Sequence, residues 1–315
     1  MIRGKSSLKY ELIRQLVKRP GHQMTVSEMC RYAGVSRSGY YRWVAAAPKR
    51  EQKERRDWEE YQKVLAAYEF RGYDKGSRGI HMRLLHEGIR MNRKKIVRLM
   101  RKYALTCPIR KANPYRRMAK AMRTNKVADN LLKREFRQHG PRKVLLTDIT
   151  YLPLNGEFLY LSVVLDVCTA EALAHVLSRS LEVDFVLQTL QLLALNHPEC
   201  INSDVMIHSD QGCHYTSVKF QELAADLGLR QSMSRRGNCW DNAPQESFFG
   251  HMKDELRKQS SNWLTFYDVK ASIDDWIDYY NNDRYRWDLE KLSPAEYYTF
   301  ITTGAYPDGM CTPKV

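Results

Sequence analysis

The sequence predicts an α/β domain built on a mixed five-stranded sheet and preceded by all-α segments. Near Lys143 the hydrophobic pattern changes from apolar residues at helical spacing to short apolar runs that are typical of strands. From that point the chain is expected to form strands and helices in the order βββαβαβα. Because helices in such an order cover the faces of a sheet, the α/β class follows.

Composition favours a folded, soluble protein without a membrane segment. The chain has 315 residues, of which 43% are hydrophobic, enough for two or more domains with buried cores. Its longest apolar stretches, 159–167 and 190–195, are far shorter than the roughly 20 residues that span a bilayer. The first ten residues show no apolar signal segment. Seven scattered cysteines without a CxxC pair favour reduced thiols over disulfides or a cysteine zinc site.

The charge is divided unevenly along the chain. Residues 1–140 hold 36 Lys and Arg against 12 Asp and Glu, a net charge of +24, whereas residues 141–315 hold 15 against 24, a net charge of −9. A positive field of that size attracts polyanions and releases counterions from phosphates. We therefore expect the first part to bind nucleic acid, with a solvated surface or general RNA binding as the alternatives.

Residues 1–57 are expected to contain a helix-turn-helix. A first helix covers Val26 to Tyr32, Gly34 supplies a left-handed turn position, and Ser36 caps a second helix. In such a motif the second helix enters a major groove. Its side chains expected to contact DNA are Arg37, Tyr40, Tyr41 and Arg42. The alternative is an αα-hairpin that packs only on itself.

A second basic helical segment is expected at residues 58–112. Stretches 80–86 and 93–103 place apolar residues at helical spacing, with Gly88 between them and cations on the other faces. The cations proposed to contact DNA are Arg93, Lys94 and Lys95. A solvated helical hairpin between domains is the alternative. Residues 113–140 are expected to form a linker with partial helix, because periodicity is lost there and prolines mark breaks.

The predicted catalytic core covers residues 141–303, and residues 304–315 form a tail. Two strands joined by a hairpin at Asn155-Gly156 are followed by a third strand at 171–178. Next come a helix at about 181–196, the strand 205–210, a helix ending at Gly228, a fifth strand and a long helix from near Asp241. This is the element order of the ribonuclease-H-like fold. The aromatic stripe at 276, 279 and 280 is expected in the core, and Ser293 with Glu296 predicts a capping box.

Three carboxylates fall where this fold could gather them. Asp148 lies on the first strand, Asp210 at the end of the fourth and Glu246 in the first turns of the helix that follows NCWDNAPQES. Carboxylate oxygens alone suit a hard cation such as Mg²⁺ or Mn²⁺, and two such ions can drive an in-line displacement at phosphorus. Lys253 follows Glu246 by seven residues, so it shares a helix face with the carboxylate and could hold a phosphate.

Two other polar residues near these strands favour structural roles. Asp166 ends the strand beside that of Asp148 and is expected to be a hydrogen-bonded structural carboxylate. His208 faces the same side of its strand as Asp210. A packed histidine and a residue that assists water or phosphate remain alternatives for it.

The motifs TDITY, HSDQGCHYTS, SMSRRGNCWDNAPQESFFGHMKDEL and YYNNDRYRWDLEKLSPAEYY resemble the catalytic core of the insertion sequence 3 family of bacterial transposases. VSRSGYYRW and GIHMRLLHEGIRMNRKKIVRLMRKYAL resemble its DNA-binding segments. The likeness covers nearly the whole chain, including the 35 residues between Asp210 and Glu246. It implies that Asp148, Asp210 and Glu246 are metal ligands and that Lys253 contacts DNA. The segments 285–291 and 166–171 depart from the family pattern away from the carboxylates.

The resemblance implies metal-dependent strand cleavage and strand transfer at the terminal inverted repeats of an insertion sequence. Double-stranded DNA is the expected partner, without a membrane or small-molecule substrate, and joining two element ends requires a homo-oligomer. We also expect a cytoplasmic protein that associates with the bacterial nucleoid when it is bound to DNA. The chain could be the downstream part of a longer, frameshift-fused enzyme. The alternatives are a ribonuclease-H-like nuclease that does not join strands and a catalytically inert DNA-binding regulator.

Overall fold

The computed structural model describes residues 6–73, 75–108, 139–210, 212–233 and 243–307. These belong to two compact units, Met1–Lys63 and Val64–Val315, which we describe separately. The predicted linker 113–140 lies outside the described residues except for its last two positions. No helix in the described ranges is both long and apolar enough to cross a bilayer.

The first unit contains the predicted helix-turn-helix. Its helices are α1 (Ser6–Val17), α2 (Val26–Ala33) and α3 (Arg37–Ala45). Thr25 and Glu28 form a capping box at the start of α2, and Ser36 caps α3 by accepting a hydrogen bond from the Gly39 amide. Between the helices Gly34 has φ 63°, in the left-handed region. The predicted start of the first helix, the turn at Gly34 and the Ser36 cap are thus present, and α2 ends at Ala33, one residue beyond the predicted end.

The core of this unit corrects one prediction. Ile13, Met29, Cys30 and Tyr40 are buried together, so the three helices pack on one another. Tyr40 is only 4% exposed, and its ring lies 6.2 Å from that of Tyr10. The Tyr40 side chain therefore belongs to the core and not to the surface expected to contact DNA, because the same face of α3 closes the module.

The second unit begins with a helical hairpin. Helix α4 (Ala47–Glu69) runs across the boundary at residue 63 and is followed by the short η1 (Phe70–Gly72). Then α5 (Ser77–His86) and α6 (Arg93–Lys102) pack together through buried aliphatic residues, including Ile80, Leu84, Ile96 and Leu99. Gly88, with φ 72°, lies between them. The two predicted helices are present, and α5 starts three residues before the predicted stretch.

The sheet has five strands in the order β3-β2-β1-β4-β5. These strands are β1 (Val144–Leu154), β2 (Glu157–Asp166), β3 (Ala172–Ser178), β4 (Met206–Ser209) and β5 (Arg230–Met233). Strands β1, β2 and β3 pair antiparallel, whereas β4 pairs parallel with both β1 and β5. Asn155 and Gly156, with φ 51° and 86°, form the predicted hairpin turn. The mixed five-stranded sheet is confirmed.

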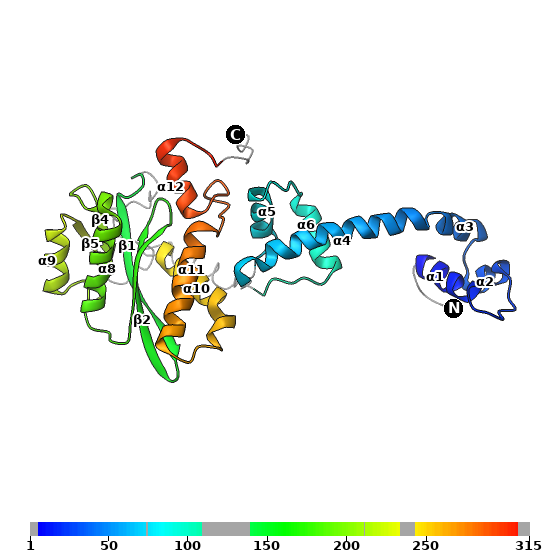
Figure 1. Cartoon of the computed structure of the whole chain (residues 1–315), viewed down its shortest axis with the longest axis horizontal. Helices are drawn as coiled ribbons and strands as arrows, with labels where there is room; N and C mark the ends of the chain where they lie inside the picture. The colour runs from blue at the N-terminus through cyan, green and yellow to red at the C-terminus, as the bar shows by residue number, and fades with distance from the viewer. Residues whose placement is uncertain (1–5, 74, 109–138, 211, 234–242, 308–315) are drawn as a thin grey trace, which may run out of the picture. The chain divides into compact units, whose positions relative to one another are not determined.

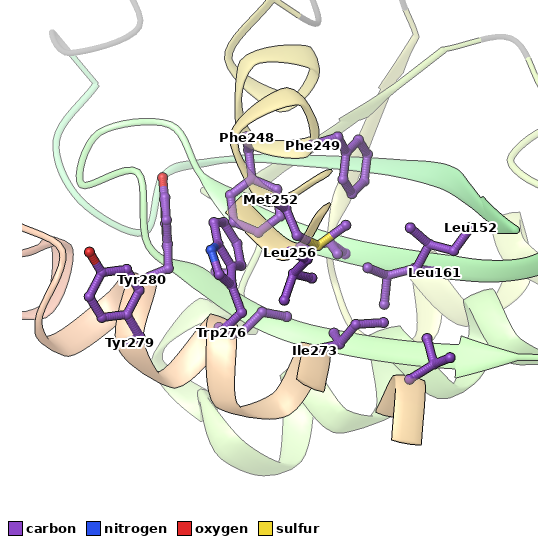
Figure 2. Packing of buried hydrophobic residues seen from close by; sticks show 14 of the residues in the cluster. Leu152, Leu161, Phe248, Phe249, Met252, Leu256, Ile273, Trp276, Tyr279 and Tyr280 are labelled. Carbon is purple, nitrogen blue, oxygen red and sulfur yellow. The ribbon is translucent and has the colours of Figure 1, made fainter. Parts of the chain in front are cut away.

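Helices cover both faces of the sheet (Figure 1). On one face, α8 (Asp184–Asn196) and α9 (Val218–Asp226) pack against apolar residues such as Leu145 and Ile207, with η2 (Pro198–Cys200) after α8. On the other, α10 (Ala243–Ser260) and α11 (Phe266–Asn282) enclose the core shown in Figure 2, including Leu161, Phe248, Met252, Ile273 and Trp276. The aromatic stripe is therefore core, as predicted.

The long helix predicted from near Asp241 corresponds to α10, and α11, which the predicted element order lacked, follows it as a separate helix. Asp241 lies outside the described residues, α10 ends at Ser260, and Thr265 begins α11 with a capping box to Asp268. Helix α12 (Pro294–Thr303) has the predicted Ser293–Glu296 capping box. The break arises because Thr265 and Asp268 satisfy a second set of helix-start amides, a local signal that the hydrophobic spacing hides.

Candidate active site and nucleic-acid surfaces

Asp148 and Asp210 come from neighbouring parallel strands. In the β1–β4 register Leu146 is opposite His208, so two residues further along both strands Asp148 is level with Asp210, just past the end of β4. Alternation along strands places both side chains on one side. The Asp148 Oδ1 accepts the Ile149 amide at 2.8 Å, and the Asp210 Oδ1 accepts the Gly212 amide at 2.8 Å.

Tyr215 is buried against β1 on the face of the sheet that α8 and α9 cover. Its side chain is 1% exposed, and its Oη is 3.4 Å from Thr147 Oγ1. Burial raises the pKa of Tyr215 well above its ordinary value, and the negative charges of Asp148 and Asp210 raise it further. The strand register places Asp148 and Asp210 level on neighbouring strands, and the Tyr215 phenol lies within electrostatic range of both.

Glu246 lies in the first turn of α10 and is exposed. The preceding Gln245 is completely buried, and its Nε2 donates a hydrogen bond to the Val163 carbonyl at 3.3 Å. Val163 is the cross-strand partner of Asp148. The start of α10 is therefore fixed over the sheet at the level of Asp148.

The three carboxylates do not form a closed metal site in this structure. Across the described part of the chain, no three His, Cys, Asp or Glu side chains lie close enough together to hold one metal ion. The two aspartates are neighbours, whereas Glu246 projects from α10 toward solvent. Lys253 is exposed on α10 two turns after Glu246, which places it on the same helix face.

Asp166 and His208 have structural contacts. The fully buried Asp166 accepts hydrogen bonds from the Arg142 amide and side chain, the Cys168 amide and Thr169 Oγ1. Arg142 also contacts Glu171 at 2.7 Å, so this cluster holds the start of β1 to the β2–β3 turn. His208 is 2% exposed, and its Nδ1 lies 3.1 Å from Ser232 Oγ. The structural interpretation of Asp166 is supported, and for His208 the packed alternative is favoured.

A buried ion pair that the sequence analysis missed anchors α10. Glu255 Oε1 accepts hydrogen bonds from Arg284 Nε and Nη2 at 3.1 and 2.9 Å, and its Oε2 accepts one from Trp276 Nε1 at 2.9 Å. The Glu255 side chain is 4% exposed. Burial alone would lower the pKa of the Arg284 guanidinium, but the charge and hydrogen bond of Glu255, together with the nearby tyrosines, outweigh burial, so the pKa is raised. This contact ties the helix that carries Glu246 to α11 and the segment after it.

The cations predicted to contact DNA are distributed over two modules. On α3, Arg37, Tyr41 and Arg42 are exposed. On α6, Arg93 and Lys94 are exposed, whereas Lys95 is half-buried. Apart from the buried Tyr40, these residues lie where a ligand could reach them.

In the second unit the helical hairpin is held to the core by acidic residues of α11 and the segment that follows it. Arg71 contacts Asp275, Asp278 and Asp283 at 2.7 to 2.9 Å. The ring of Tyr73 stacks on that of Tyr279 with centroids 4.5 Å apart. Three carboxylates of residues 141–315 thus form ion pairs with an arginine of the same chain. No sequence signal pointed to these contacts, which join residues about 200 positions apart.

Comparisons with known proteins agree with this architecture. Two models of the integrase core domain match residues 138–239 and 227–294, and a model of an HTH-like domain matches residues 55–113. The chain is 31% identical over 280 residues to the putative transposase InsK for insertion sequence element IS150 of Escherichia coli strain K12, covering 86% of this chain and 93% of that protein. The chain belongs to the insertion sequence 3 family of transposases.

A further relative of this transposase is the uncharacterized 31 kDa protein of insertion element IS600 from Shigella sonnei. The two are 30% identical over 276 residues, which is 85% of this chain and 97% of that protein. Among solved structures, the HTLV-2 integrase catalytic core domain in complex with magnesium matches 50% of this chain and 97% of its own length, at 15% identity and a TM-score of 0.40.

Family membership confirms the main expectations from the sequence. The transposase has the integrase-like ribonuclease H fold, with the predicted mixed sheet, after helical segments. The match of an HTH-like domain to 55–113 coincides with the second basic segment. The integrase core also places the chain in a family of enzymes that transfer phosphoryl groups with Asp and Glu residues.

Proposed function

We propose that this transposase cleaves DNA at the terminal inverted repeats of an insertion sequence and joins the cut ends to a target. Asp148, Asp210 and Glu246 are the proposed catalytic residues. The observation that carries the proposal is the pair of aspartates that lie level on two neighbouring parallel strands, Asp148 within β1 and Asp210 just past the end of β4, beside a helix that begins with a third carboxylate.

The donor atoms of this site fit Mg²⁺ or Mn²⁺. All three proposed ligands offer carboxylate oxygens, which hard divalent cations prefer. When bound, two such ions supply activation of the attacking hydroxyl and stabilisation of the leaving oxygen. Asp148 and Asp210 are level on neighbouring strands, with their side chains on one face of the sheet. The proposal requires the exposed Glu246 carboxylate to approach them, since the described residues contain no closed three-ligand group.

Cationic side chains hold the DNA in this proposal. Lys253 lies on the face of α10 that carries Glu246, so its ammonium group can contact a phosphate beside the reacting one. Arg37, Tyr41 and Arg42 on α3, and Arg93, Lys94 and Lys95 on α6, are proposed to bind more distant DNA. Because two element ends are joined, two or more copies of the chain act together.

The function is tested with the purified full chain and a labelled duplex that ends in the element's terminal repeat. With Mg²⁺ or Mn²⁺ we expect both nicked strands and strands joined to a target duplex. Nicks without joined strands would favour the non-joining nuclease. If the chain binds the duplex but gives no metal-dependent product, a regulatory DNA-binding role replaces the proposal.

Replacing both Arg37 and Arg42 with Gln should weaken DNA binding and its dependence on salt. Each phosphate contact contributes about 0.9 to the slope of log K against log salt concentration, so two lost contacts reduce the slope by about 1.8. Fluorescence anisotropy over a series of salt concentrations measures it. The control is Lys270→Gln on α11, whose ammonium is paired with Asp274 at 2.6 Å. Equal slopes for the double variant and wild type would remove α3 from the interface.

A further inference from the structure

We propose that Tyr215 and Gln245 are positioning residues that set the spacing of the three catalytic carboxylates. The buried Tyr215 hydrogen bond joins the segment after Asp210 to β1 beside Asp148. The buried Gln245 hydrogen bond joins the start of α10, next to Glu246, to β2 opposite Asp148. The inference rests on the proposed function and adds to it the residues that hold the ligands in place.

Tyr215 ties the loop after Asp210 to β1. Its hydroxyl contacts Thr147, the residue before Asp148, while its amide donates to the Gly212 carbonyl at 3.1 Å. From β5, Gln231 Nε2 donates to the Tyr215 carbonyl at 2.8 Å. The ring packs edge-on against Phe220 at 5.2 Å. Tyr215 is therefore held through both its backbone and its side chain.

The chemistry of Tyr215 suits a buried place within electrostatic range of two carboxylates. Burial and the charges of Asp148 and Asp210 raise its pKa, so the phenol stays neutral and adds no third negative charge. The loop is also tight, since a Cβ on Gly212 would lie 2.8 Å from Asp210 Oδ1. Because the Tyr215 amide donates to the Gly212 carbonyl and the Gly212 amide donates to Asp210 Oδ1, a shift of Tyr215 would be passed on to Asp210.

Gln245 ties α10 to the same level of the sheet. Its amide group donates to the carbonyl of Val163, directly across from Asp148 in β2. Its Oε1 is buried without a hydrogen-bond partner in the described residues. Burying an unsatisfied polar atom costs free energy that an apolar side chain of similar shape would avoid. The unpaired Oε1 offsets part of what the Nε2 hydrogen bond contributes to stability, and that hydrogen bond also holds the residue before Glu246 level with Asp148.

The Tyr215 hydrogen bond ends at Thr147, the residue before Asp148. The Gln245 hydrogen bond ends at Val163, the cross-strand partner of Asp148. Metal and catalytic sites work only when their groups are held within about 0.5 Å of the productive geometry. Removing either tie should therefore disturb metal binding while the packed helices and sheet remain.

The test uses the full chain and Mn²⁺ binding followed by electron paramagnetic resonance, with thermal unfolding measured in parallel. Tyr215→Phe and Gln245→Met each keep the shape of the side chain and remove its hydrogen bond. We expect each to weaken Mn²⁺ binding by about tenfold or more, the usual effect of losing a group that orients a ligand. Ser162→Ala is the matched control, because Ser162 Oγ is also buried on β2 but has no hydrogen-bond partner in the described residues.

The outcomes separate this inference from the proposed function. If wild type binds Mn²⁺ and both variants bind it equally well, the inference is wrong while the proposed site stands. If wild type binds no Mn²⁺, the proposed metal site and the inference are both overturned. Should Tyr215→Phe fail to fold, Thr147→Val removes the other end of the same hydrogen bond and should weaken binding equally.

Discussion

Glu246→Gln is expected to abolish metal-dependent cleavage and joining of DNA. The substitution keeps the size of the side chain and removes the negative charge proposed to hold the metal ion. Loss of a group that only orients a metal ligand already costs 10- to 100-fold, so loss of the ligand itself should lower the cleavage rate by more than about 100-fold. Single-turnover cleavage of labelled element-end DNA measures the effect.

Binding of the uncleaved duplex should stay within about twofold of wild type, because Glu246 is exposed and its loss leaves no buried group unpaired. Glu222→Gln on α9 is the matched control, an exposed carboxylate on the opposite face of the sheet from α10. A Glu246→Gln protein that cleaves as fast as the control would refute the assignment of all three carboxylates as one site.

Local sequence patterns predicted most of the fold. Apolar alternation found the first three strands, and the turn at Asn155-Gly156 fixed their hairpin register. Helix α11 was not predicted as a separate helix, because apolar residues at 263 and 264 hide the break and only the Thr265 capping box marks its start. Tyr40 was expected on the surface, since spacing alone does not say which face of α3 the other helices cover.

The candidate site was predictable only in part. The carboxylates stand out because strand ends and a helix start are local features, and the family motifs name the same residues. The contacts that support the carboxylates could not be predicted in this way. Tyr215 contacts Thr147, 68 positions away in the sequence, and Gln245 contacts Val163, 82 positions away. A side chain that bonds to a backbone carbonyl leaves no pattern in the sequence of either partner. Tertiary structure is needed to find such contacts.

The structure also shows which cations pair with the acidic residues of the core. An acidic core would repel DNA if all of its carboxylates faced solvent together. Instead, Arg71 neutralises acidic residues on and just after α11, and Arg142 neutralises Asp166 and Glu171. Lys253 remains exposed beside the proposed catalytic helix face. These ion pairs offset the charges of Asp275, Asp278, Asp283, Asp166 and Glu171 within the protein.

Glu255→Ala should destabilise the second unit more than any surface substitution. It leaves the Arg284 guanidinium and the Trp276 Nε1 without the acceptor that each now uses. Breaking a buried ion pair by removing one partner costs about 3–5 kcal/mol. Since 19% of the Arg284 side chain is exposed and water can reach part of it, we expect the lower end, about 3 kcal/mol. Urea unfolding followed by tryptophan fluorescence measures the loss.

Two comparisons identify the cause of that loss. Lys270→Ala breaks an exposed pair with Asp274 on α11 and should cost less than about 1 kcal/mol. In the double variant Glu255→Leu with Arg284→Met the unpaired charge is absent, so it should be more stable than Glu255→Leu alone. If the single and double variants unfold at the same urea concentration, the ion pair is not what anchors α10. In that case the aromatic packing of Trp276 against Phe248, with ring centroids 5.3 Å apart, holds the helix instead.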